Sequence, residues 1–202
     1  MNQNPVKFIL ASASARRLDL LTQIGITPDL IEAADLDESV LKSETPRAHG
    51  ERLAGEKARA VAARHATRYA GALVLGADTV VACGRRIMPK AETPEVARNC
   101  LRQLSGRRHR VLSAICLIKP DGAELRRTVE TIVRFKRLEA DEIETYIVGG
   151  EWQGKAGGYA IQGHAAVFAA WINGSYSNVV GLPLFETHAL LKSAGLGSRT
   201  PV

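Results

Sequence analysis

Residues 6–25, VKFILASASARRLDLLTQIG, predict a buried strand that turns directly into a helix. The apolar run over residues 6–11 is typical of a strand in the core of a sheet. Leu18, Leu21 and Ile24 then recur at helical spacing, and Gly25 is a typical helix stop. A strand that leads straight into a helix is the building unit of an α/β protein, and the rest of the chain continues the alternation.

Capping patterns and apolar runs divide the rest of the chain into further helices and strands. Thr45-Pro46 predicts the start of a helix that continues to about His65, and Thr93-Pro94 predicts another that ends at Ser105-Gly106. Further helices are expected from Asp141 and after GLP at 181–183, and strands over 72–82, 110–118, 126–135 and 165–172. We therefore predict a mixed α/β fold, a central sheet flanked by helices, in a single domain over residues 1–202 with a loose tail at 195–202.

The charge of the chain points to an anionic partner. Lysine and arginine number 27 against 21 acidic residues, and the formal net charge of +6 attracts nucleic acids, nucleotides or acidic membranes. Aromatic residues make up only 5% of the chain, which argues against binding of single-stranded nucleic acid by stacking. No apolar run is long enough to span a membrane, and the N-terminus lacks a secretory pattern. The three cysteines are widely spaced, which argues against a disulfide framework or a zinc cluster. We expect a cytoplasmic protein that does not bind membranes and for which nucleic acid is the less favoured anionic partner.

Two serines and two arginines stand where the first strand meets the first helix. Ser12 and Ser14 are suited to accept hydrogen bonds from the first N–H groups of the helix, but one hydroxyl is enough for that. Arg16 and Arg17 have the wrong sign for the helix dipole unless an anion binds there, and guanidinium groups bind phosphate oxygens in pairs. The stretch fits either a phosphate site or an ordinary capped helix with solvated arginines. It is neither a P-loop nor a dinucleotide motif.

An acid and a base interrupt apolar patterns elsewhere in the chain. Asp78 lies inside the strand-like run at 72–82, where a carboxylate needs a metal, a cationic side chain or hydrogen bonds from a loop. Lys57 shares a helical stripe with Leu53 and Val61, and its amine extends either to water or into a cleft. The acidic stretch over 35–38 is either solvated surface or, together with Asp78, a site for a hard divalent cation.

Six sequence blocks occur in a fixed order over nearly the whole chain. They are LASASARRLDLL, LAGEKARAVA, GADTVV, LRQLSGRRHRV, KAGGYAIQG and INGSYSNVVGLPL. Together, over residues 8–191, they resemble the Maf family of nucleoside triphosphate pyrophosphatases. The resemblance implies a fold similar to that of inosine triphosphate pyrophosphatases (Maf/Ham1-like), with two lobes around a cleft. It also implies hydrolysis of a nucleoside triphosphate to the monophosphate and pyrophosphate, with Mg²⁺ or Mn²⁺ as cofactor, and it suggests a homodimer.

The resemblance further implies roles for individual residues. Asp78 would be the general base or a metal ligand, Glu38 a second metal ligand, and Lys57 and Lys90 catalytic cations. The substrate-binding residues would be Ser12, Ser14, Arg16, Arg17, Thr79 and Gln162. We expect Asp78→Asn to keep the fold and lose turnover. We expect alanine at Lys57 or Arg17 to weaken hydrolysis with little change in melting temperature.

The residues of three of these blocks indicate the substrate. The chain resembles the branch of the family that prefers dTTP and UTP, because it carries the motifs GADT, SGRRH and KAGGYAIQG. The resemblance implies that the enzyme removes such nucleotides from the nucleotide pool. Ala15 stands where the family usually has proline, which removes no ligand. Two alternatives stay open. One is an enzyme of the same fold that acts on purine triphosphates such as ITP. The other is a basic regulatory protein that binds nucleic acid or cell-division partners without catalysis.

Overall fold

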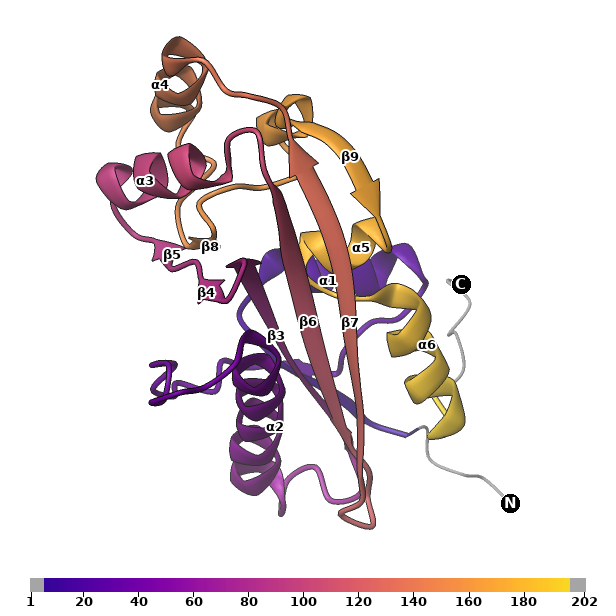
Figure 1. Ribbon diagram of the computed structural model, residues 1–202. Helices are drawn as coiled ribbons and strands as arrows, with labels where there is room; N and C mark the ends of the chain where they lie inside the picture. The colour runs from indigo at the N-terminus through magenta and orange to yellow at the C-terminus, as the bar shows by residue number, and fades with distance from the viewer. Residues whose placement is uncertain (1–5, 197–202) are drawn as a thin grey trace.

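The computed structural model describes residues 6–196, which form one long mixed sheet with helices on both faces (Figure 1). The strands of this sheet are β1 (Phe8–Ala11), β2 (Leu30–Ile31), β3 (Leu73–Cys83), β4 (Arg86–Ile87), β6 (Arg108–Ile118), β7 (Glu124–Phe135) and β9 (Ala169–Asn173). The order is β2-β1-β3-β6-β7-β9, with β4 paired to the end of β3. β1 is parallel to both of its neighbours, β2 and β3. The remaining pairs along this order, β3–β6, β6–β7 and β7–β9, are antiparallel. The predicted mixed α/β class is confirmed.

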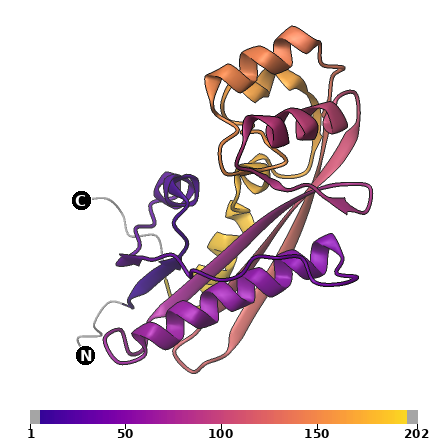
Figure 2. The ribbon, with the colours of Figure 1, turned by 90° about the vertical axis from the view of Figure 1, so that its left-hand side faces the viewer.

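The helices divide between the two faces and a smaller lobe (Figure 2). They are α1 (Ala15–Gln23), α2 (Pro46–His65), α3 (Pro94–Leu104), α4 (Ala140–Gly149), the 3₁₀-helix η1 (His164–Phe168), α5 (Tyr176–Val180) and α6 (Leu184–Ser193). α2 lies along one face of β3 and β6, and α5 and α6 lie on the other face. α3 and α4 pack together beside a second sheet, formed by β5 (Lys90–Ala91) and β8 (Lys155–Ala156). We call these four elements the α3–α4 lobe.

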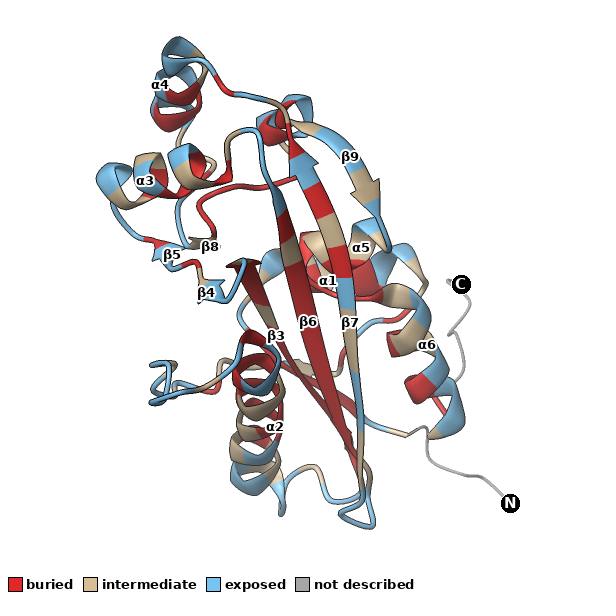
Figure 3. Cartoon of the chain, viewed as in Figure 1, coloured by how far each residue is buried: buried red, intermediate tan, exposed pale blue. Residues whose placement is uncertain are grey.

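Alternating side chains of the central strands fill two apolar clusters, one on each face of the sheet. Phe8 and Leu10 point into the larger cluster, and Ile9 and Ala11 into the smaller one beneath α2. This period of two is what a strand with both faces covered requires. The central strands are accordingly buried along most of their length (Figure 3).

A glycine brings α2 unusually close to β3. A Cβ atom at Gly76 would lie 2.3 Å from the carbonyl oxygen of Ala54 and 2.6 Å from the backbone nitrogen of Ala58, so only glycine fits there. The helix starts as predicted, with Thr45 accepting a hydrogen bond from Ala48 N at 3.2 Å and proline in the first turn. The close approach sets the middle of α2 beside the part of β3 that follows Gly76.

The structure differs from the prediction near the C-terminal half of the sheet. Residues 165–172 were expected to form one strand, but η1 occupies 164–168 and β9 only 169–173. Ala165 and Phe168 are both fully buried, and this spacing of three fits a 3₁₀-helix rather than a strand. α5 and the two-residue strands β2, β4, β5 and β8 were not predicted, because such short elements leave no periodic pattern.

At the C-terminus, Leu196 is buried and its backbone N–H donates to Leu191 O at 2.9 Å. The expected loose tail therefore does not begin at 195, and its part from residue 197 onward lies outside the described residues. No helix within residues 6–196 is long and apolar enough to cross a bilayer.

Candidate active site

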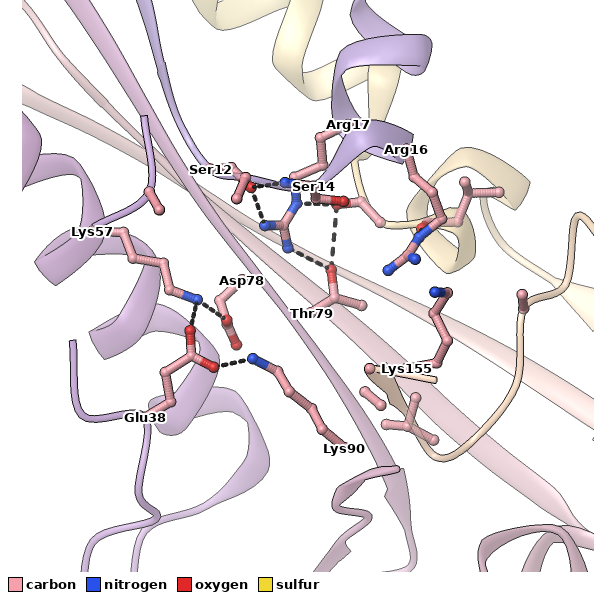
Figure 4. A pocket seen from close by; sticks show the side chains of 18 of the residues that line it. Ser12, Ser14, Arg16, Arg17, Glu38, Lys57, Asp78, Thr79, Lys90 and Lys155 are labelled. Atoms are coloured by element: carbon pink, nitrogen blue, oxygen red, sulfur yellow. Dashed lines mark hydrogen bonds and ion pairs between the residues drawn. The ribbon is translucent and has the colours of Figure 1, made fainter. Parts of the chain in front are cut away.

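A cleft of about 350 Å³ lies between the central sheet and the strands of the α3–α4 lobe. Every residue predicted to act in the site lines it, and Figure 4 shows most of them from close by. These residues are Ser12, Ser14, Arg16, Arg17, Glu38, Lys57, Asp78, Thr79, Lys90 and Gln162. The fold thus brings together side chains that lie up to 150 positions apart in the sequence, from 12 to 162.

Arg17 is held rigidly in the wall of the cleft. Its guanidinium donates to Ser12 Oγ at 2.9 Å, to Thr79 Oγ1 at 3.2 Å and to Gly181 O at 3.0 Å. The residue is only 9% exposed. Burial lowers the pKa of Arg17, although the charges of Asp78 and Glu38 oppose that shift. All three acceptors are neutral, so the geometry fixes the guanidinium without cancelling its charge.

The two serines do not cap α1 as expected. Ser14 is the N-cap residue, yet its side chain makes no capping hydrogen bond. Ser12 Oγ instead accepts from Ser14 N at 3.3 Å and from Arg17. The positive end of α1 therefore opens onto the cleft, and the Ser14 hydroxyl makes no hydrogen bond with another residue among those described.

A chain of ion pairs crosses the opposite side of the cleft. Lys57 Nζ lies 2.7 Å from Asp78 Oδ1 and 2.6 Å from Glu38 Oε1, and Lys90 Nζ contacts Glu38 Oε2 (Figure 4). Asp78 is 5% exposed and Lys57 9% exposed. Burial opposes ionisation of Glu38, but the hydrogen bonds and charges of Lys57 and Lys90 outweigh it and lower the pKa of Glu38 to about 2. Asp78 Oδ2 has no hydrogen-bond partner within residues 6–196 and remains available to a ligand.

The two carboxylates of this ion-pair chain suit a hard divalent cation. Nowhere in the described part of the chain do three or more His, Cys, Asp or Glu side chains gather as a metal site. Glu38 and Asp78, however, meet at one ammonium group, so their oxygens are close neighbours. Mg²⁺ is commonly held by one or two carboxylates with phosphate oxygens and water as its other ligands. The donor set fits a cation that arrives with its substrate.

Lys155 is a cleft residue that the sequence did not single out. It lies on β8 and lines the cleft near Arg16 (Figure 4), and its amine donates to its own segment at Gln153 O, 2.9 Å away. Burial, and then the charge of Arg16, lower the pKa of Lys155. Burial also lowers the pKa of Arg16. The only signal in the sequence was the glycine-rich context of GKAGG, which favours close backbone approach.

Three cations of the cleft have no anionic partner in the described part of the chain. Arg16, Arg17 and Lys155 form no ion pair with any acidic side chain among residues 6–196. Arg16 instead donates to Val180 O at 3.3 Å. Buried or half-buried charges are normally paired, because desolvation of an unpaired charge is unfavourable. The arrangement therefore calls for an anionic ligand in the cleft.

Comparison with known proteins gives a consistent result over nearly the whole chain. The family model described as Maf-like protein matches residues 7–194. A relative from Novosphingobium aromaticivorans, named dTTP/UTP pyrophosphatase, is 60% identical over 197 residues, covering 98% of this chain and 96% of the relative. One of the same name from Rhodospirillum rubrum is 59% identical and covers 93% and 87% of the two chains.

Solved structures are more distant. A HAM1 protein from Coxiella burnetii is 17% identical, with a TM-score of 0.47 over 94% of this chain and 100% of that one. A dITP/XTP pyrophosphatase from Mycobacterium abscessus is 20% identical, with a TM-score of 0.42 over 67% of this chain and 75% of that one. The match of the family model over residues 7–194 and the 60% identity to the relative from Novosphingobium aromaticivorans establish that the chain belongs to the Maf family.

Proposed function

We propose that this protein hydrolyses dTTP and UTP to the nucleoside monophosphate and pyrophosphate. The proposal is carried by one observation: within residues 6–196, the cations Arg16, Arg17 and Lys155 have no acidic partner and line the same cleft as the Asp78 carboxylate, one oxygen of which is unpartnered. The names of the close relatives support the substrates. A triphosphate presents several negative charges along one chain of phosphates, and further charge spreads over its phosphoryl oxygens during reaction.

The cations have the task of binding and stabilising that charge. Arg17 is preorganised by its three neutral acceptors, so it loses little freedom when a phosphate binds. The Ser14 hydroxyl and the open end of α1 add neutral donors to the same wall. Lys90 is half exposed and reaches across the cleft to Glu38, which leaves its amine able to exchange that partner for a phosphate.

Asp78 and Glu38 have different tasks because both oxygens of Glu38 contact a lysine, whereas only Oδ1 of Asp78 does so within residues 6–196. A general base works best when its pKa is near the working pH, and the pKa of Glu38, at about 2, is too low for that. Glu38 therefore acts as a permanent anion. Asp78, with Oδ2 unpartnered, is the residue that orients and deprotonates the attacking water. Both carboxylates would hold Mg²⁺ or Mn²⁺, which supplies charge neutralisation at the phosphates when bound.

Gln162 supports recognition of the base. Its side-chain amide lines the cleft and makes no hydrogen bond with another described residue. A carboxamide offers both an acceptor and donors, which complement the imide edge shared by thymine and uracil. Reading this shared edge would explain acceptance of both dTTP and UTP, which differ in the sugar hydroxyl and the base methyl group.

A pyrophosphate-release assay tests the proposal. We expect dTTP and UTP to give pyrophosphate and the monophosphate with Mg²⁺, and CTP, ITP and 7-methyl-GTP to react more slowly. Addition of a chelator should abolish release. Orthophosphate without pyrophosphate would indicate cleavage at the terminal phosphate and contradict the proposal. Tight, salt-sensitive nucleic-acid binding without any hydrolysis would favour the regulatory alternative.

The homodimer and the cytoplasmic location stay predictions. Light scattering on the purified protein measures the mass in solution, and a mass twice that of the 202-residue chain would support the dimer.

A further inference from the structure

A buried histidine and a buried tyrosine are joined behind one wall of the cleft. His109 Nε2 lies 2.8 Å from the Tyr159 hydroxyl, and the two residues are 1% and 6% exposed. Phe135 packs edge-on against both rings, at centroid distances of 4.9 Å. Burial lowers the pKa of His109 to about 4, so the ring is neutral at pH 7, and burial also raises the pKa of Tyr159. His109 Nδ1 has no hydrogen-bond partner within the described chain.

This pair is an unusual feature of an apolar core. Phenylalanine and leucine would fill the same space without a polar group to satisfy, and a half-satisfied polar pair is less stable than apolar packing. The hydrogen bond also fixes the position of one ring relative to the other, which apolar packing alone does less specifically.

The backbone around Tyr159 forms the wall of the cleft that carries Lys155 and Gln162. Residues 155, 156 and 159–162 all line the cleft, and we call residues 155–162 the recognition wall. Only its first two residues belong to a strand. Beyond them, the wall turns at Gly157 and Gly158, which have φ angles of +68° and +69°. Few backbone hydrogen bonds fix it, among them Gly157 N to Pro89 O at 3.0 Å and Ala160 N to the Tyr146 hydroxyl at 3.0 Å, and the buried side chains of Tyr159 and Ile161 anchor it in the larger apolar cluster.

His109 connects this wall to the strand that carries Asp78. His109 is on β6, and the next residue, Arg110, is paired with Ala82 of β3. Asp78 lies on β3, four residues before Ala82. The hydrogen bond between His109 and Tyr159 is therefore a direct cross-link between the rigid sheet and the wall. Tyr159 is also three residues from Gln162, so a shift of its ring is transmitted along a short backbone segment.

We propose that the His109–Tyr159 hydrogen bond is a positioning pair that holds the recognition wall in register with Asp78 and so sets the choice among nucleoside triphosphates. The proposal rests on the proposed function for its kinetic consequence. Both residues act through the wall and neither is placed against the reacting atoms. Small misplacements of a binding wall are costly, since a shift of about 1 Å can lower rates by about 100-fold.

Tyr159→Phe is the direct test, because it keeps the ring and removes only the hydroxyl. We expect the ratio of kcat/KM for dTTP over CTP to fall at least tenfold, mainly through a higher KM for dTTP. We also expect the backbone amides of residues 157–163 to exchange with deuterium at least about tenfold faster, as local opening becomes easier. His109→Gln, which keeps an amide near the position of Nε2, should retain the ratio within about threefold.

Val61→Ala is the matched control. Val61 is fully buried in the apolar cluster beneath α2, so the variant loses stability without touching the wall. An unchanged ratio and unchanged exchange in Tyr159→Phe, or an equal fall of the ratio in Val61→Ala, would overturn the proposal. If the unmodified protein released no pyrophosphate from any triphosphate, the proposed function would fail. The exchange comparison would then still decide whether the pair holds the wall.

Discussion

Replacement of Lys57 by methionine removes the cation that joins two carboxylates. Lys57 is nearly buried, and its pair with Asp78 at 2.7 Å is the most enclosed contact of the ion-pair chain. Removal of one partner from a buried pair leaves an uncompensated charge and destabilises by about 3–5 kcal/mol. We take the lower end, because Glu38 is partly exposed and keeps Lys90 as a partner.

A loss of about 3 kcal/mol is large for a chain of this size. For 202 residues, it corresponds to a fall in melting temperature of about 6–12 °C. Equilibrium unfolding in urea measures the free energy of unfolding directly. The sequence alone suggested little change in stability on replacement of Lys57, and the burial of its amine between two carboxylates revises that expectation.

A double-mutant cycle separates the ion pair from general packing. Asp78→Asn removes the charge that Lys57→Met leaves unpaired, so the double variant should be more stable than additivity predicts by about 2 kcal/mol. Lys192→Met makes the same substitution at an exposed helical position and should change stability by less than about 0.5 kcal/mol. Additive losses, or a loss below about 1 kcal/mol for Lys57→Met, would refute the reasoning.

Three further predictions concern packing, pH and binding. Gly76→Ala forces its Cβ against Ala54 O and should lower the free energy of unfolding by about 3 kcal/mol in urea titrations, whereas an unchanged midpoint would contradict the close approach of α2. His109 has a folded pKa of about 4, below the ordinary value near 6.5, so the unfolded chain binds more protons between these values. Stability should therefore fall by about 3 kcal/mol as the pH drops from 6.5 to 4, and His109→Gln should lack this part of the slope. Lys155→Met should raise KM for dTTP about tenfold and leave kcat within about threefold, because its amine is expected to bind phosphate and takes no part in the ion-pair chain. Steady-state kinetics that give an unchanged KM would exclude a role of Lys155 in binding the substrate.

The long elements of the fold could be predicted from the sequence because each leaves a periodic or capped pattern. The run at 6–11 and the Thr45-Pro46 cap are examples, and both elements lie where expected. η1 and α5 were missed because five residues carry too little pattern to separate a helical turn from a strand or loop.

The site could be predicted only in part, for a related reason. Asp78 and Lys57 stood out because each is a charge in an apolar pattern, and the structure pairs them. Lys155 did not stand out because it lies in a glycine-rich stretch of the sequence, where a lysine is unremarkable. Neither the missing cap at Ser14 nor the contact between His109 and Tyr159 could be predicted, since both depend on side chains that only the tertiary fold brings together.

Pyrophosphate release from dTTP by the unmodified protein and by Asp78→Asn, compared at equal folded concentration, tests the central claim most directly. We expect the unmodified protein to yield pyrophosphate and dTMP, and Asp78→Asn to retain its circular dichroism spectrum with kcat reduced at least about 100-fold. Turnover by a folded Asp78→Asn at the rate of the unmodified protein would contradict the role of Asp78 in the cleft.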